Sequence, residues 1–184
     1  MILKKIFFPL FSVFLAYRTW ILMEKLGNSL PSHYSVGQSI ILAFILTLVI
    51  TGIFAFIGFA YPTNKLLPHS YYKIKNPIVL NTAYKWLGLR YFKYLLLLTF
   101  WGKKDNRKKY FNGTKQGLKN FIFQTKQSEF GHLAAFILIL ICSLILLYQR
   151  HYFIVFFMTL FNITGNIYPV LLQRFHRLRV DRFS

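Results

Sequence analysis

The chain has 184 residues, of which 55% are hydrophobic and 15% charged, and its 23 lysines and arginines against four acids give a formal net charge of +19. Soluble domains usually carry about 25% charged residues. The composition therefore argues against a soluble enzyme, a disordered chain and a multidomain protein, and it favours an integral membrane protein with basic faces at the membrane surface.

Four apolar stretches approach the roughly 20 residues that a helix needs to cross a bilayer core about 30 Å thick. They cover residues 6–23, 38–60, 133–148 and 152–172. The first contains Pro9 and Arg18, and we expect it to span with Arg18 reaching the interface, or to lie in the interface itself. The last two are separated by Arg150 and His151, so they predict an antiparallel hairpin.

A strongly basic region separates the second apolar stretch from the third. Within it, Tyr84 to Trp101 places Lys85, Arg90 and Lys93 on one arc of about 140° at 100° per residue. The segment then becomes apolar but is too short to cross, which predicts an amphipathic interfacial or re-entrant helix. The following Gly102 to Gly113 is read as a solvated basic turn.

These elements predict an all-α integral membrane protein with about four transmembrane helices and one interfacial helix. We divide it into N-terminal membrane segments (1–61), a basic cytoplasmic or interfacial region (62–129) and a C-terminal transmembrane hairpin with a basic tail (130–184). Fourteen basic residues lie between Lys65 and Lys126, and the positive-inside rule then places both termini in the cytoplasm of a multi-pass cell-membrane protein, in the inner or plasma membrane. The expected partners are membrane lipids with anionic headgroups, and not nucleic acid.

The polar residues near the hairpin are the most informative, because polar groups inside a membrane are costly. Glu129 and His132 lie three residues apart on one helical face, and Asn162, Asn166 and Gln173 share a face of the last span. Equal chain distances from the turn bring the two sets to one depth. We expect them to meet at the cytoplasmic membrane surface.

Such a cluster fits several chemistries. A carboxylate can orient a histidine that deprotonates a hydroxyl, and amide groups can donate to a developing oxyanion. Arginines just beyond can hold a phosphate or a carboxylate bidentately. A purely structural interpretation also fits, since asparagines often join transmembrane helices by hydrogen bonds. No metal site is expected, because a single Glu-x-x-His is only part of a di-iron motif.

At these positions the sequence resembles the glycosyl-4,4'-diaponeurosporenoate acyltransferase family. The resemblance lies in Gln124 to Glu129 (QTKQSE) with His132, in the asparagines of the last span with Pro169, and in Gln173 to Arg179 (QRFHRLR). Leu67-Pro68 with Tyr71-Tyr72 is similar to an early element of the family, so the resemblance covers roughly Leu67 to the C-terminus. It implies transfer of a fatty acyl group onto a sugar hydroxyl of a glycosylated isoprenoid, carotenoid or related lipid.

In this hypothesis His132 is the general base, Glu129 orients it, and Asn166 with Asn162 or Gln173 polarises the acyl carbonyl. The residues expected to bind the donor's phosphates or the bilayer are Arg174, Arg177, Arg179 and Lys126. No bound cofactor is expected, and an activated acyl donor such as acyl-CoA is the co-substrate. Two alternatives stay open: another lipid-modifying membrane transferase, and a non-catalytic membrane subunit that docks partners through its basic interfacial stretch.

Overall fold

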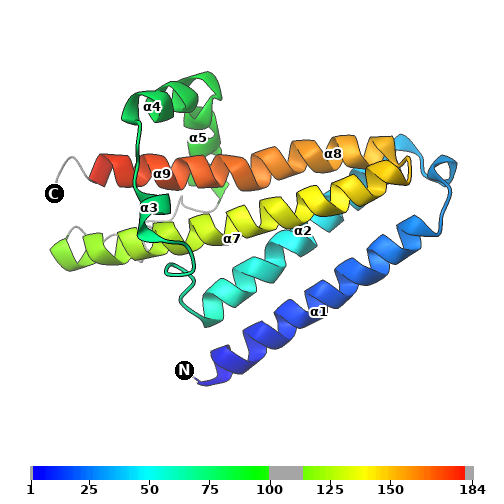
Figure 1. The fold of residues 1–184 in the computed structure, drawn as a ribbon, viewed down its shortest axis with the longest axis horizontal. Helices are drawn as coiled ribbons and strands as arrows, with labels where there is room; N and C mark the ends of the chain where they lie inside the picture. The colour runs from blue at the N-terminus through cyan, green and yellow to red at the C-terminus, as the bar shows by residue number, and fades with distance from the viewer. Residues whose placement is uncertain (1, 100–113, 181–184) are drawn as a thin grey trace. The chain divides into compact units, whose positions relative to one another are not determined.

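The computed structural model describes residues 2–99 and 114–180, and within these ranges the secondary structure is helical with no strand. Figure 1 shows the helices in chain order. Four of them are long and apolar enough to cross a membrane, namely Ile2–Gly27, Val36–Ala60, Gln116–Tyr148 and Tyr152–Val180. The predicted all-α class with four candidate spans is confirmed. The predicted basic turn at 102–113 lies outside the described residues.

The chain forms two compact units. Unit 1 contains residues 1–62 and 131–167, and unit 2 contains residues 63–130 and 168–184. The first two borders fall one residue from the predicted domain borders, whereas the third divides the last candidate span. The predicted division into three regions stays an interpretation.

Unit 1 is built from α1 (Ile2–Gly27), the short turn η1 (Pro31–His33), α2 (Val36–Ala60), the second half of α7 (Lys115–Tyr148), α8 (Tyr152–Asn162) and the π-helical turn η2 (Ile163–Ile167). Helix α2 begins at a capping box, in which Ser35 and Gln38 exchange hydrogen bonds between side chain and backbone. The Ser12 hydroxyl donates to the Ile53 carbonyl oxygen at 2.9 Å and joins α1 to α2. Arg18 is exposed on α1.

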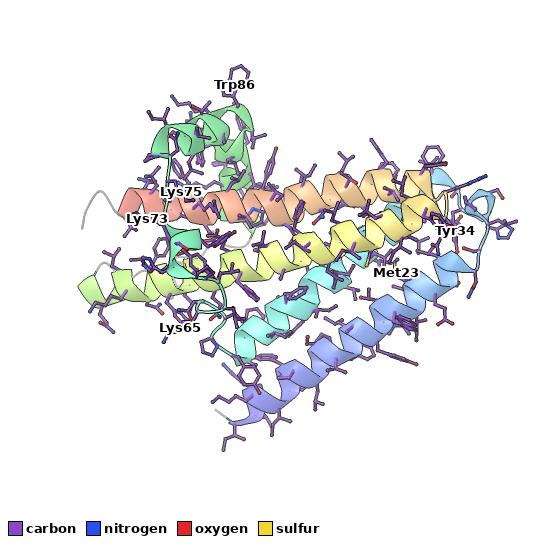
Figure 2. All side chains as sticks on the ribbon, in the orientation of Figure 1. Met23, Tyr34, Lys65, Lys73, Lys75 and Trp86 are labelled. Carbon is purple, nitrogen blue, oxygen red and sulfur yellow. The ribbon has the colours of Figure 1, made fainter. Side chains whose placement is uncertain are left out.

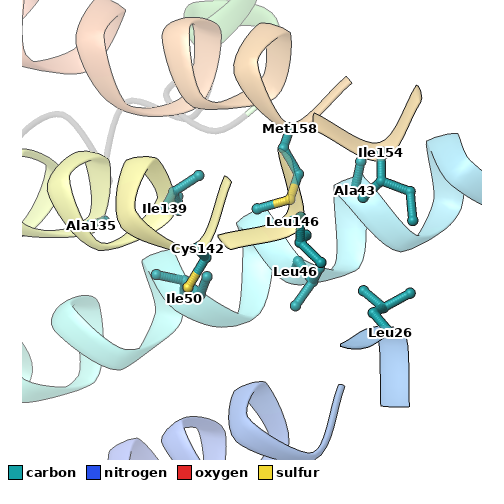
Figure 3. Close-up of a cluster of buried hydrophobic side chains, with 10 residues drawn as sticks. All are labelled: Leu26, Ala43, Leu46, Ile50, Ala135, Ile139, Cys142, Leu146, Ile154 and Met158. Atoms are coloured by element: carbon teal, nitrogen blue, oxygen red, sulfur yellow. The ribbon is translucent and has the colours of Figure 1, made fainter. Parts of the chain in front are cut away.

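The core of unit 1 is apolar and periodic. Its members recur every three or four residues along α2, α7 and α8, as a buried helical face requires. They are Leu26, Ala43, Leu46, Ile50, Ala135, Ile139, Cys142, Leu146, Ile154 and Met158 (Figure 3). The hairpin turn lies where the sequence placed it, with Arg150 in the left-handed region at φ 65°.

Unit 2 is built from α3 (His69–Tyr72), α4 (Pro77–Trp86), α5 (Leu89–Thr99), the first half of α7 and α9 (Tyr168–Val180). The prediction of one continuous interfacial helix from Tyr84 to Trp101 is wrong. The chain breaks at Gly88, whose φ of 63° ends α4 before α5 begins. Trp86 is 86% exposed and projects from the end of α4 (Figure 2).

Helices α4 and α5 both pack on α9. The rings of Tyr84 and Phe175 stack with centroids 3.8 Å apart, and Phe92 meets Tyr168 edge-on at 5.5 Å. These contacts hold the two short helices against α9, which carries Arg174, Arg177 and Arg179. The outward faces of α4 and α5 keep exposed aromatic side chains, the kind that sits in the headgroup zone.

Candidate functional site

The first polar cluster lies in unit 1, where His132 of α7 meets Asn166 of the π-helical turn. His132 Nδ1 lies 3.0 Å from Asn166 Oδ1. The amide nitrogen of Asn166 donates to Asn162 Oδ1 at 3.0 Å and to Thr51 Oγ1 at 3.2 Å. Asn162 in turn donates to the Phe136 carbonyl oxygen at 3.1 Å. Asn166 is fully buried, so its side chain is fixed by these bonds.

The hydrogen bonds of Asn166 determine which nitrogen of His132 carries the proton. Both amide hydrogens of Asn166 go to Asn162 and Thr51, so the amide oxygen faces the imidazole. An oxygen accepts only from a protonated nitrogen, which makes Nδ1 the donor and leaves Nε2 with the lone pair in the neutral ring. The result is a histidine held by an asparagine in one tautomer.

Two parts of this cluster were not predicted from the sequence. The last span was expected as a continuous α-helix, but Ile163–Ile167 is π-helical, a distortion that often occurs at functional sites. Thr51 was also missed, because a threonine in an apolar helix usually bonds the carbonyl four residues back, as Thr47 does with Ala43. The hydroxyl of Thr51 instead points at Asn166, and nothing in the local sequence distinguishes it from Thr47.

The second polar cluster lies in unit 2, around Glu129. The Glu129 carboxylate is fully buried and accepts a hydrogen bond at each oxygen, from Arg174 Nε at 2.7 Å and from Arg177 Nη2. Beside it, Gln173 Nε2 donates to Ser128 Oγ at 3.3 Å. The first half of α7 and the helix α9 are therefore joined by charge-assisted bonds, which are about twice as strong as neutral ones.

Two tyrosines of α3 complete this cluster. Arg174 lies over the Tyr71 ring at 4.8 Å from its centroid, while Arg177 and Lys126 lie 5.5 and 5.3 Å from the centroid of Tyr72. Such distances give cation–π attraction. Burial, with the Glu129 carboxylate as second cause, raises the pKa of Tyr72 to about 12. Burial also raises the pKa of Tyr71. Both phenols therefore stay neutral at physiological pH.

The structure thus brings the predicted residues together in two groups. His132, Asn162 and Asn166 form one, and Glu129, Arg174, Arg177 and Lys126 belong to the other, with Gln173 bonded to Ser128. Arg179 is exposed and belongs to neither group of described residues. Glu129 has arginines as its partners, so its predicted role in orienting His132 stays a prediction. Among the described residues there is no group of three or more histidine, cysteine or acidic side chains that could hold a metal ion.

A family model described as glycosyl-4,4'-diaponeurosporenoate acyltransferase (CrtO) matches residues 68–184. The chain belongs to this family. It is therefore a transferase enzyme of the acyltransferase type. The matched range contains all nine site residues predicted from the sequence and both tyrosines of α3, whereas Thr51 lies outside it. Among curated proteins and solved structures, no match to the chain is found.

Proposed function

We propose that this acyltransferase is membrane-bound and moves a fatty acyl group from an activated donor onto a sugar hydroxyl of a glycosylated isoprenoid, carotenoid or related lipid. The family supports the reaction class, and the four apolar helices support a bilayer location. The observation that carries the mechanism is the bond from His132 to Asn166, because it leaves the other ring nitrogen as a base.

In the proposed reaction, Nε2 of His132 takes the proton of the acceptor hydroxyl. The oxygen attacks the acyl carbonyl, a new ester C–O bond forms, and the bond from the acyl carbon to the leaving group breaks. The imidazolium then returns its proton to the leaving group. Throughout these steps Asn166 Oδ1 accepts from Nδ1–H and stabilises the imidazolium. The reaction needs no bound cofactor beyond the acyl donor.

Asn166 has a different role here from the one expected from the sequence. Both its amide hydrogens are used within the protein, so in this proposal it positions His132 and does not polarise the acyl carbonyl. The polarising role remains a prediction for Asn162 or Gln173. In this proposal Asn166 and Thr51 are positioning residues, because Asn166 contacts the base and Thr51 contacts Asn166.

The proposed location is the cell membrane, with both termini in the cytoplasm. The positive-inside rule supports this orientation, since Lys65, Lys73 and Lys75 (labelled in Figure 2) belong to the region with the highest density of basic residues. Exposed Arg179, together with Lys85 and Arg90 on α4 and α5, would meet anionic headgroups.

The test is lipid and pigment profiling of cells that lack the gene and carry wild type, His132→Ala or His33→Ala. His33 is exposed in η1 and serves as the matched control. We expect a non-acylated glycolipid or glycosyl carotenoid to accumulate in the empty strain and with His132→Ala, and to disappear with wild type and His33→Ala. Full acylation by a well-expressed His132→Ala protein would refute the base assignment.

A further inference from the structure

The charges of the Glu129 cluster do not balance. Lys126, Arg174 and Arg177 surround the two tyrosines, and Glu129 is the sole acid in the described part of unit 2. The cluster therefore carries an excess of two positive charges. Burying unpaired charge is costly, so a partly buried cluster of this kind calls for an anion that the described residues do not supply.

Arg177 has hydrogen-bond donors to spare. Its residue is 4% exposed, yet its Nε and Nη1 atoms have no hydrogen-bond partner among the described residues, and Nη2 alone reaches Glu129. The face of Tyr72 attracts the guanidinium charge but offers these N–H groups no oxygen acceptor. Buried donors are nearly always paired, and an absent ion is one of the accepted reasons for an exception.

Lys126 and Arg174 give the cluster its access to solvent. Lys126 is partly exposed, and the side chain of Arg174 is 31% exposed. Lys126 and Arg177 share the ring of Tyr72, so their like charges repel each other unless an anion lies near both. An anion that enters beside Lys126 and Arg174 could accept hydrogen bonds from Nε and Nη1 of Arg177 once the side chains adjust.

We propose that Lys126, Arg174 and Arg177 form a binding site for the dianionic phosphate group of a ligand. A phosphate carries about −1.5 to −2 charge at pH 7, which matches the excess charge, and its oxygens suit the guanidinium fork. A carboxylate would leave one positive charge without a counterion. The identification of this ligand as the acyl donor rests on the proposed function, but the binding itself is measurable without turnover.

The experiment is a calorimetric titration with inorganic pyrophosphate at constant ionic strength. The sample is the purified full-length protein in phosphatidylcholine nanodiscs. We expect saturable binding that Arg177→Gln weakens at least tenfold and that Arg90→Gln, which removes an exposed arginine of α5, changes less than twofold. If Arg177→Gln does not fold, Lys126→Gln against exposed Lys119→Gln provides the same comparison. No saturable binding, or equal losses in each target and its control, would overturn the proposal.

A second series distinguishes a soluble phosphate from a lipid headgroup. If the site binds lipid headgroups, nanodiscs that contain phosphatidic acid should weaken pyrophosphate binding. If the site binds a soluble donor, they should leave the binding unchanged. Either result supports the site, provided that binding still depends on Arg177. His132→Ala should bind pyrophosphate as wild type does. If binding fails while His132→Ala still abolishes acyl transfer, the phosphate site is refuted and the proposed function stands.

Discussion

Nδ1 of His132 donates to Oδ1 of Asn166 across 3.0 Å, and this bond connects the middle of α7 to the π-helical turn that follows α8. An asparagine in this place accepts from the imidazole without adding a charge inside the membrane. The bond therefore fixes the ring at a lower desolvation cost than a carboxylate would require.

Asn166→Leu keeps the side-chain size and removes the acceptor for Nδ1–H. A general base contributes roughly 10²- to 10⁴-fold, so loss of its orientation should lower kcat about tenfold to hundredfold. Asn166→Asp keeps an acceptor and should retain more activity than Asn166→Leu. The measurement is acyl transfer by purified protein, with the exposed Asn28→Leu as control. Equal kcat in Asn166→Leu and wild type would show that the bond has no part in catalysis.

Thr51→Val removes the hydroxyl that meets both polar atoms of Asn166, at 3.2 and 3.4 Å. A lost hydrogen bond of this kind costs about 1 kcal/mol, and the freed amide should lower kcat by a few-fold. Thr47→Val is the matched control, because Thr47 lies one turn away on α2 and donates to the Ala43 carbonyl oxygen of its own helix. Kinetic assays and thermal unfolding of both variants are the measurements. We expect the two variants to differ more in kcat than in thermal stability. Identical kinetics in the two variants would contradict the role of Thr51.

Glu129→Ala leaves Arg174 and Arg177 facing each other without their shared carboxylate. Removing one partner of a buried ion pair costs about 3–5 kcal/mol, so we expect a large fall in thermal stability. Glu129→Gln keeps an acceptor oxygen and should lose less. Thermal unfolding in detergent, with the exposed Glu24→Ala for comparison, measures the difference. A Glu129→Ala protein as stable as Glu24→Ala would show that the pair contributes nothing.

The phenol of Tyr72 should lose its proton at a higher pH than an ordinary tyrosine does. Burial, and next the Glu129 carboxylate, raise its pKa to about 12 from the ordinary 10.0. The neutral phenol is favoured in the folded state, so its contribution to stability is complete below pH 10 and is lost as the pH rises through 12. The difference in ultraviolet absorbance between wild type and Tyr72→Phe should show a midpoint near pH 12. A midpoint at pH 10 would place the phenol in water.

Depth along the hairpin was predictable, because two antiparallel helices that leave one turn descend at the same rate. Counting from that turn brought Glu129 and His132 to one depth with Asn166 and Gln173, and hydrogen bonds join His132 to Asn166 within unit 1 and Gln173 to Ser128 within unit 2. The spans were predictable for the same kind of reason, since the bilayer fixes how many apolar residues a helix needs.

Partner choice within that depth was not predictable. The spacing of Glu129 and His132 on one face suggested a pair and gave no sign of Arg174 and Arg177, whose guanidinium groups bond the Glu129 carboxylate. The break at Gly88 was hidden because the surrounding pattern is amphipathic on both sides of it. The contribution of α3 depends on tertiary packing, which places Tyr71 and Tyr72 beside residues more than fifty positions away.

The position of Thr51 has a consequence for truncated variants of this enzyme and for chimaeras with other members of its family. Residues 68–184 carry the family's signature, yet the hydroxyl that helps to hold Asn166 comes from α2, before that signature begins. A fragment trimmed to residues 68–184 would keep His132 and Asn166. It would lose Thr51, which is one of the two side chains that accept from the Asn166 amide. Exchanging the first two helices between members of the family would then be a way to tune turnover without altering any signature residue.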